Sequence, residues 1–307
     1  MNPELFRVLD VSFPAYFVLL LTGFALATAI GVLRARRIGL DPDVVVDLAL
    51  ASLLMGVVGG RLLHVLADGY FWDYVHLCTD PGKVDWKVEQ ALCTTRYEGV
   101  WDAARGVCHP READCFAWAK FWAGGLTYYG GIIAAVAVGI YLCRRDRLPV
   151  WKAADLAGVA IPVGLGFGRI GCFLAGCCFG PITTSRLGVS FPPHSPASEA
   201  QFKLGLLPST GAWSRPVHPA QIYEALVCFT VAAACMLFVQ GRKRYDGQVF
   251  LAFLALYAVG RFFLELLRAD DRGGMFGLST SQLISLAVLA GVAVVHRARL
   301  RGRRAGS

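Results

Sequence analysis

Charged residues are scarce in this chain. Aspartate, glutamate, lysine and arginine make up 17% of its 307 residues, whereas hydrophobic residues make up 56%. A soluble globular domain carries about 25% charged residues, so this scarcity excludes an ordinary soluble fold. The composition instead predicts an all-α membrane protein, in which residues 1–307 form a single integral-membrane domain.

A nucleic-acid-binding patch is lacking as well, although the net charge is +8. Half of the 30 lysine and arginine residues lie in four short runs, at 34–37, 144–152, 242–244 and 297–304. Each run follows an apolar segment or lies between two of them. Cytoplasmic loops of membrane proteins carry such positive charge. The pattern therefore indicates a membrane topology, and no nucleic-acid partner is expected.

Seven apolar segments are long enough to cross a bilayer, which takes about 20 residues. They lie near 12–33, 45–67, 124–143, 153–175, 218–240, 247–267 and 277–296. The basic runs follow the first, third, fifth and seventh of them, so we expect the N-terminus outside and the C-terminus in the cytoplasm. No basic region precedes the first segment, which favours a retained helix over a signal peptide. The tail at 297–307 is expected to be a basic cytoplasmic anchor for anionic lipid.

Two long segments fall outside the membrane in this topology. The cysteines of the first segment, 68–121, are Cys78, Cys93, Cys108 and Cys115. An extracytoplasmic compartment favours disulfides between them, and three pairings are open. Free thiols or a zinc site that includes His109 are the alternatives, but the spacings do not match a CxxC-type site. The second segment, 180–217, is rich in Ser, Pro and Gly and is expected to be a partly ordered outer loop.

Ionisable residues within spans are energetically costly and usually functional. The chain has six of interest, namely Arg61, Arg169, His218, Glu224, Arg261 and Glu265. The topology, drawn from loop charges alone, places all of them in the outer half of the membrane, near Tyr129 and its neighbouring glycines. Salt bridges, capping and snorkelling would explain any one of them. Three arginines facing two glutamates, however, leave positive charge uncompensated, which predicts an anionic ligand such as a phospholipid headgroup.

Five motifs occur in a fixed order: GGR at 59–61, WAGGLTYYGG at 122–131, GRIGCFLAGCCFG at 168–180, HPAQIYE at 218–224 and GRFFLELLR at 260–268. The chain resembles the prolipoprotein diacylglyceryl transferase family in these motifs, in the order of the motifs and in the seven predicted spans. The resemblance covers nearly the whole chain except 68–121, which looks like an insertion.

The resemblance implies that the lipobox cysteine of a prolipoprotein attacks the glyceryl carbon of phosphatidylglycerol and that glycerol phosphate leaves. Such chemistry needs a base for the thiol and cations for the departing phosphate. By resemblance, Arg169 and Arg261 would stabilise the phosphate, and Glu265 would orient Arg261. Tyr16, in the first span, matches the position of a family tyrosine near the headgroup. The residues that the motifs place near the substrate are Arg61, Gly130, Gly131, Cys172, Cys177, Gly180, and, at the mouth of the pocket, His218 and Glu224.

The chain departs from the family pattern in two motifs. Family members commonly have GRxGNFxNxExxG, whereas this chain has Cys172, Ala175 and Cys177 in place of the two asparagines and the glutamate. Tyr129 stands where the family has the histidine of SFHGG. Three hypotheses follow: a divergent transferase in which Tyr129 helps to deprotonate the acceptor, catalysis by an enzyme cysteine, and lipid binding without catalysis.

The three cysteines within 172–178 have several interpretations of their own. A disulfide among them, or simple packing, is the preferred one. A disulfide is feasible only if the helix ends near Gly176, which is a reasonable C-terminal stop. A reactive thiol beside Arg169 comes second. A metal site comes last, because only His218 is a plausible fourth ligand, and neither a metal nor another cofactor is expected.

We therefore predict a seven-span enzyme in the inner membrane of a bacterium, with its active site facing the outer leaflet. The expected donor is phosphatidylglycerol or another anionic phospholipid, and the expected acceptor is a lipobox-containing prolipoprotein. The alternatives are a family member that uses another lipid group or another acceptor, and a non-catalytic protein that binds anionic lipid.

Overall fold

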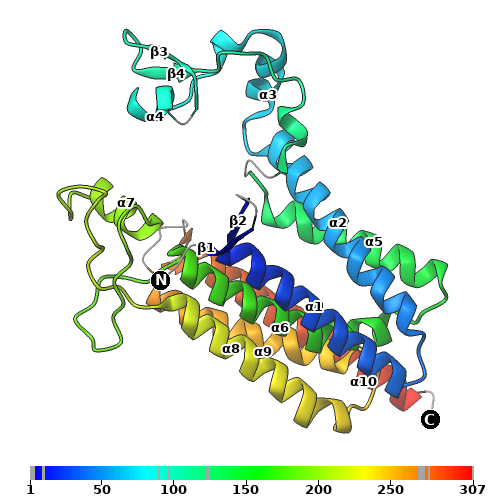
Figure 1. The fold of residues 1–307 in the computed structure, drawn as a ribbon. Coiled ribbons are helices and arrows are strands. Elements are labelled where there is room, and N and C mark those ends of the chain that lie inside the picture. Colours follow the sequence, from blue (N-terminus) through cyan, green and yellow to red (C-terminus); the bar gives the residue numbers. More distant parts are fainter. Residues whose placement is uncertain are drawn as a thin grey trace. The chain divides into compact units, whose positions relative to one another are not determined.

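The computed structural model describes residues 4–8, 11–88, 90–95, 97–121, 125–268, 274–275 and 277–305. The first three residues of the motif at 122–131 and the last two of the basic tail lie outside this part of the chain. The chain forms two compact units (Figure 1). Unit 1 comprises Met1–Val45 and Pro149–Ser307, and unit 2 comprises Val46–Leu148.

The long helices of unit 1 form a bundle around a central helix. They are α1 (Ala15–Arg37), α6 (Val150–Ala175), α8 (Ala220–Ala234), α9 (Gln248–Leu264) and α10 (Thr280–Ala305). The central α6 packs against α1, α8 and α9, and α10 packs against α9 (Figure 1). Val159, Val231 and Phe253 are buried in the core that α6, α8 and α9 share. A π-helical turn at Cys235–Val239 and a 3-10 turn at Gln240–Arg242 extend α8.

Two short antiparallel hairpins accompany these helices. One pairs β1 (Glu4–Val8) with β2 (Val11–Pro14), and the other pairs β5 (Gly274–Met275) with β6 (Leu278–Ser279). The first hairpin leads directly into α1 and the second into α10. They therefore mark the ends at which these two helices begin.

Six helices of the described residues are long and apolar enough to cross a membrane. They are α1, α2 (Pro42–Ala67), α6, α8 with its extension to Arg242, α9 with its extension to Leu267, and α10 as far as Gly302. The third predicted span forms α5 (Tyr128–Arg145), an 18-residue helix whose hydropathy is lowered by two tyrosines at its start and two arginines at its end. The predicted helical fold with helices that could span a membrane is confirmed, while insertion into a membrane, the seventh crossing and the orientation stay predictions.

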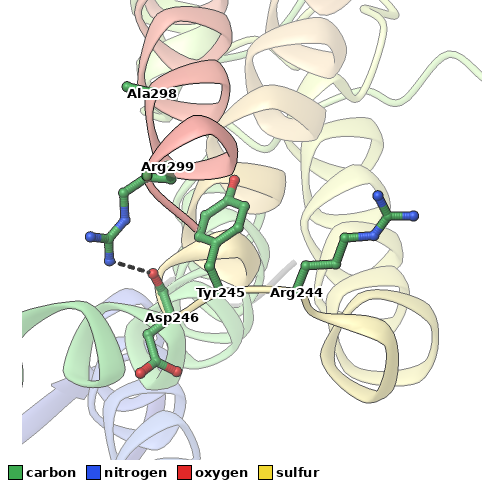
Figure 2. Close-up of a pocket in the computed structure, with 6 residues that line it drawn as sticks. Arg244, Tyr245, Asp246, Ala298 and Arg299 are labelled. Carbon is green, nitrogen blue, oxygen red and sulfur yellow. Dashed lines mark hydrogen bonds between the residues drawn. The ribbon is translucent and has the colours of Figure 1, made fainter. Parts of the chain in front are cut away.

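Charged side chains join the helices of unit 1 at the end where α6 and α9 begin. Asp155 accepts a hydrogen bond from the N–H of Val249, in the first turn of α9, at 2.8 Å, and its other carboxylate oxygen lies 2.9 Å from Lys243 Nζ. Figure 2 shows Arg299 of α10 beside a pocket, donating to the backbone oxygen of Asp246 at 2.9 Å. We call this the Lys243 end, and it holds three of the predicted basic runs.

The segment 180–217 of unit 1 is more ordered than its composition predicts. It contains α7 (Pro196–Lys203), whose first turn is capped by the hydroxyl of Ser195. Phe191 is fully buried in a small core with Val217. Serine and proline of this segment therefore form the start of α7. The segment as a whole packs around a small core of its own.

Close contact between α2 and α5 in unit 2 depends on glycine. A Cβ atom added to Gly59 would lie 2.3 Å from the Cβ of Ala134, and one added to Gly130 would lie 2.3 Å from the Gly59 carbonyl oxygen. The N–H of Thr127 also donates to the carbonyl oxygen of Gly60 at 3.0 Å. The glycine pairs therefore allow the close helix approach that the sequence predicts.

The predicted extramembrane segment of unit 2 consists of short elements. They are α3 (Phe71–Thr79), a 3-10 turn at Pro81–Lys83, α4 (Gln90–Thr95), β3 (Val100–Asp102) paired with β4 (Val107–His109), and a 3-10 turn at Ala117–Ala119. Disulfides join Cys78 to Cys115 and Cys93 to Cys108. These bonds confirm the predicted disulfides and select one of the three pairings. His109 hydrogen-bonds to a backbone carbonyl instead of completing a zinc site with the cysteines.

Loss of the Cys78–Cys115 disulfide is expected to lower the stability of unit 2. The bond joins residues 37 positions apart, and closing a loop of this length contributes about 4 kcal/mol in the chain-entropy account. Cys78→Ser and Cys115→Ser should each lower the melting temperature of the detergent-solubilised protein, while the polar residues of unit 1 keep their arrangement. Cys143→Ser, which replaces a free cysteine, is the control. An unchanged melting temperature in either disulfide variant would refute the cross-link.

Candidate functional site

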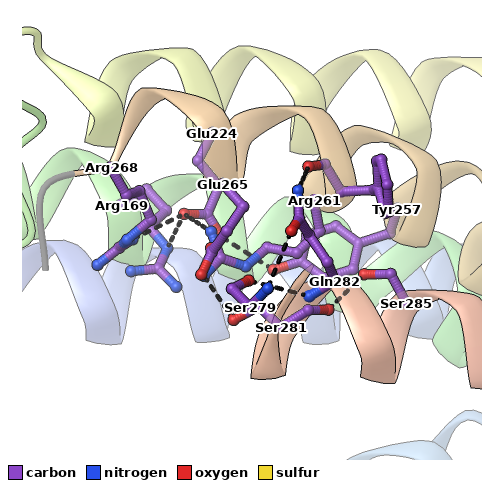
Figure 3. A network of polar contacts seen from close by, with 11 residues as sticks. Arg169, Glu224, Tyr257, Arg261, Glu265, Arg268, Ser279, Ser281, Gln282 and Ser285 are labelled. Atoms are coloured by element: carbon purple, nitrogen blue, oxygen red, sulfur yellow. Dashed lines mark hydrogen bonds and ion pairs between the residues drawn. The ribbon is translucent and has the colours of Figure 1, made fainter. Parts of the chain in front are cut away.

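Glu224 is the centre of a polar cluster in unit 1 (Figure 3). Its side chain lies near the start of α8 and is 2% exposed. Its Oε2 faces Arg169 Nε at 3.2 Å, Arg268 Nη1 at 3.8 Å and Arg261 Nη1 at 3.9 Å. The hydroxyl of Tyr257 donates a hydrogen bond to Oε1 at 2.9 Å. A buried carboxylate needs such partners, because an unpaired charge in an apolar medium is costly.

Helix α9 supplies one side of the cluster through its periodicity. Tyr257, Arg261 and Glu265 follow one another at intervals of four residues, which places them on one face of the helix. Arg261 Nη2 lies 2.9 Å from Glu265 Oε2 and donates to the hydroxyl of Ser281, at the start of α10, at 3.3 Å. The pairing of Arg261 with Glu265 that the spacing predicts is confirmed.

Three guanidinium groups meet the two carboxylates of the cluster among the described residues. Arg169, Arg261 and Arg268 face Glu224, and Arg261 also pairs with Glu265. The side chain of Arg268 is 4% exposed and that of Arg261 is 12% exposed, whereas that of Arg169 is 26% exposed. Arg169 is therefore the most open of the three to a ligand. Because guanidinium groups match the oxygens of a phosphate in geometry and charge, the cluster can bind a phosphate group.

Arg268 is a member of the cluster that the sequence analysis misses. It ends the motif at 260–268, but no role follows from its position in that motif. The available signal was its spacing, seven residues or about two helical turns after Arg261. With Arg268, unit 1 alone contains three arginines that face the carboxylate of Glu224.

Other predicted residues lie at the same end of unit 1, opposite the Lys243 end, and we call it the Glu224 end. The N–H of Gly180 donates to the carbonyl oxygen of His218 at 2.8 Å, and a Cβ at Gly180 would lie 2.9 Å from the His218 Cβ. This close approach requires glycine. The imidazole of His218 lies 3.3 Å from the hydroxyl of Tyr223. At the start of α1, Tyr16 packs so closely on α6 that a Cβ at Gly171 would lie 3.2 Å from the Tyr16 Cα.

Three cysteines lie where α6 ends, also at the Glu224 end. The helix ends before Gly176, which caps it in the left-handed conformation with φ of 73°, as the sequence predicts. The Sγ atoms of Cys172, Cys177 and Cys178 all lie within 4.8 Å of one another, yet all three thiols are free. Of the two preferred interpretations, a disulfide or simple packing, the disulfide is therefore not formed within this group.

Unit 2 contains the remaining predicted site residues, Arg61, Tyr129, Gly130 and Gly131. The side chain of Arg61 is buried and donates to the carbonyl oxygens of Trp118 at 2.7 Å and Ala117 at 2.6 Å. These bonds tie α2 to the segment 68–121. Tyr129, in the first turn of α5, is exposed. The structure thus gives one group of candidate residues in each unit, and joint action of Tyr129 with the arginines of unit 1 stays a prediction.

A sequence model of a known family matches most of the chain. The family is described as prolipoprotein diacylglyceryl transferase, and the matched residues are 3–90 and 97–297. The gap at 91–96 is much shorter than the insertion predicted at 68–121, so most of the extramembrane segment aligns with the family.

Relatives that match most of the chain carry the corresponding name, phosphatidylglycerol–prolipoprotein diacylglyceryl transferase. One from Clostridium tetani is 29% identical over 98% of this chain and 99% of its own length. One from Geobacter sulfurreducens is 29% identical, covering 88% of this chain and 83% of its own length. One from Cereibacter sphaeroides is 33% identical, covering 82% of this chain and 89% of its own length. This chain belongs to the prolipoprotein diacylglyceryl transferase family.

Proposed function

We propose that this protein transfers the diacylglyceryl group of phosphatidylglycerol to the lipobox cysteine of a prolipoprotein. The observation that carries the proposal is the group of three guanidinium groups around the buried carboxylate of Glu224, with Arg169 as its most open member. An anionic phospholipid headgroup matches guanidinium groups in charge and geometry. The names of the relatives give phosphatidylglycerol as donor and a prolipoprotein as acceptor.

In the proposed reaction the acceptor thiol loses its proton, and its sulfur bonds to the glyceryl carbon of the lipid. The bond between that carbon and the phosphate oxygen breaks, and glycerol phosphate leaves with the electron pair. Arg169 and Arg261 stabilise the negative charge that develops on this phosphate. Glu265 holds the guanidinium group of Arg261 in place through their 2.9 Å contact.

The membrane topology is part of the proposal. With α5 as the third of seven spans, the N-terminus lies outside and the Lys243 end faces the cytoplasm, in agreement with the rule that cytoplasmic loops are basic. The Glu224 end then lies in the outer half of a bacterial inner membrane. Lipid in the outer leaflet and an acceptor anchored in the same membrane both reach this depth.

Mass spectrometry of a lipobox peptide tests the proposed function. The purified protein is incubated with phosphatidylglycerol and the peptide, and a peptide with serine in place of its cysteine is the control. We expect a gain of one diacylglyceryl group on the peptide cysteine and none on the control. A lipid adduct on an enzyme cysteine would support transfer to another acceptor. No adduct anywhere, with lipid still co-purifying, would support lipid binding without catalysis.

A further inference from the structure

The three free thiols at the end of α6 have the spacing of metal ligands. A tetrahedral zinc ion with Zn–S bonds of about 2.3 Å holds its sulfurs about 3.8 Å apart. The Sγ atoms of Cys172, Cys177 and Cys178 lie within 4.8 Å of one another, so small side-chain rotations bring them to that spacing. The sequence spacing alone does not predict this proximity. Cys172 lies on α6, whereas Cys177 and Cys178 lie beyond its end, where helical periodicity no longer fixes their positions.

The backbone holds the three sulfurs together. Gly176 and Cys178 both adopt the left-handed conformation, with φ of 73° and 60°, so the chain turns back on itself after α6. The N–H of Cys177 donates to the carbonyl oxygen of Cys172 at 3.1 Å, and the side-chain amide of Gln221 donates to the carbonyl oxygen of Cys177 at 2.6 Å. A hydrogen-bonded turn therefore brings the ligand atoms together.

The cysteines of the chain fall into two classes. The four in the extramembrane segment of unit 2 are joined in pairs at bonding distance, whereas the three at the end of α6 are free although they are close together. A disulfide would use two of these sulfurs and leave the third unused, but a metal ion uses all three.

We propose that Cys172, Cys177 and Cys178 bind a soft divalent metal ion of the zinc class through their three sulfurs. Within the described ranges, no further histidine, cysteine, aspartate or glutamate joins this group. An ion with three protein ligands keeps its fourth position for water or substrate, as in catalytic zinc sites.

The open position gives the site a role in transfer, and this step rests on the proposed function. When the acceptor's lipobox thiol coordinates such an ion at the open position, it gives up its proton. This proton passes to solvent water. The acceptor sulfur then forms its bond to the glyceryl carbon as the bond from carbon to phosphate oxygen breaks. The ion would thereby supply the thiolate in a chain that has Tyr129 at the position of the family's histidine.

Metal analysis of the purified protein tests the binding site directly. Protein purified without chelator under reducing conditions should contain about one zinc per chain. Cys172→Ser, Cys177→Ser and Cys178→Ser should each lose most of it, and the control Cys143→Ser should keep it. Replacement of the ion by Co²⁺ should produce intense sulfur-to-cobalt charge-transfer absorption, which reports thiolate ligands independently of activity. A metal-free parent protein that also lacks this absorption with added Co²⁺ would overturn the site.

Titration of the Co²⁺ protein with the lipobox peptide separates the two levels of the proposal. A change in the cobalt spectrum with the cysteine peptide, and none with the serine peptide, would support coordination of the acceptor. An unchanged spectrum together with full transfer by the metal-free protein would overturn the activating role. If the metal is bound and the spectrum changes but no peptide is lipidated, the proposed transfer fails while the metal site stands. Alkylation of whole cells blocks the free thiols, so that no new disulfide can form afterwards. A disulfide found among the three cysteines after this treatment would overturn metal binding.

Discussion

Arg169→Ala is expected to abolish diacylglyceryl transfer. Arg169 has the most exposed guanidinium group of the three that face Glu224, and its Nε lies 3.2 Å from the carboxylate. It is therefore placed to meet the phosphate as that group leaves. Loss of one donor at a developing charge costs about 10²–10³-fold in rate, and weaker lipid binding adds to this loss. Arg261→Ala should have the same result, because Arg261 contacts two carboxylates of the cluster.

Controls separate this effect from a general loss of charge. Arg186→Ala removes an exposed arginine from the segment 180–217 and should leave transfer unchanged. Arg169→Lys keeps the charge but loses the planar fork, so it should recover only part of the rate. The measurement is lipidation of the lipobox peptide over time, together with the melting temperature of each variant. Near-normal turnover by either alanine variant, Arg169→Ala or Arg261→Ala, would refute the assignment of these arginines to the phosphate.

Glu224→Ala is expected to destabilise unit 1 by about 3–5 kcal/mol, the usual cost of leaving a buried charge without its partner. The carboxylate is 2% exposed and is the common partner of three guanidinium groups. Its removal leaves these groups to repel one another, and the hydroxyl of Tyr257 loses its acceptor. Glu224→Gln keeps the volume and one acceptor oxygen, so its effect should be smaller. Thermal denaturation in lipid nanodiscs measures both.

Glu199→Ala is the matched control, since Glu199 is an exposed carboxylate on α7 of the same unit. It should change the melting temperature little, because exposed charges contribute about 0–1 kcal/mol. If Glu224→Ala were as stable as the parent protein, the carboxylate would not be what holds the arginines together. Bound lipid phosphate would then be the counter-charge, and removal of lipid from the variant should lower its stability.

Much of the fold could be predicted from the sequence, because a bilayer imposes strong rules on composition. Six of the predicted spans are helices of sufficient length and hydropathy, and the pairing of Arg261 with Glu265 follows from helical periodicity. Within unit 1, loop charges alone placed Arg169 and Glu224 at the same depth. The helix end at Gly176 was equally predictable, because glycine readily adopts the left-handed cap.

Contacts between distant parts of the chain could not be predicted in the same way. Which arginines share the carboxylate of Glu224 depends on how α6, α8 and α9 pack, so Arg268 was missed. The proximity of the three cysteines depends on a turn that includes a left-handed Cys178, which no residue preference predicts. Arg61 was predicted to be a ligand for lipid, but its bonds to backbone carbonyls depend on the path of the extramembrane segment.

Asp155 gives the bundle a fixed register. Its carboxylate holds the N–H of Val249, and Arg261 lies twelve residues further along the same helix, about 18 Å away at 1.5 Å per residue. A rigid helix transmits position over that length, so the contact with Asp155 at the Lys243 end sets both the height and the rotational position of the Arg261 guanidinium group at the Glu224 end. One residue inserted between them would turn Arg261 by about 100° around the helix axis. The position of Arg261 at the Glu224 end is thus set by the contact between Asp155 and the start of α9 at the Lys243 end.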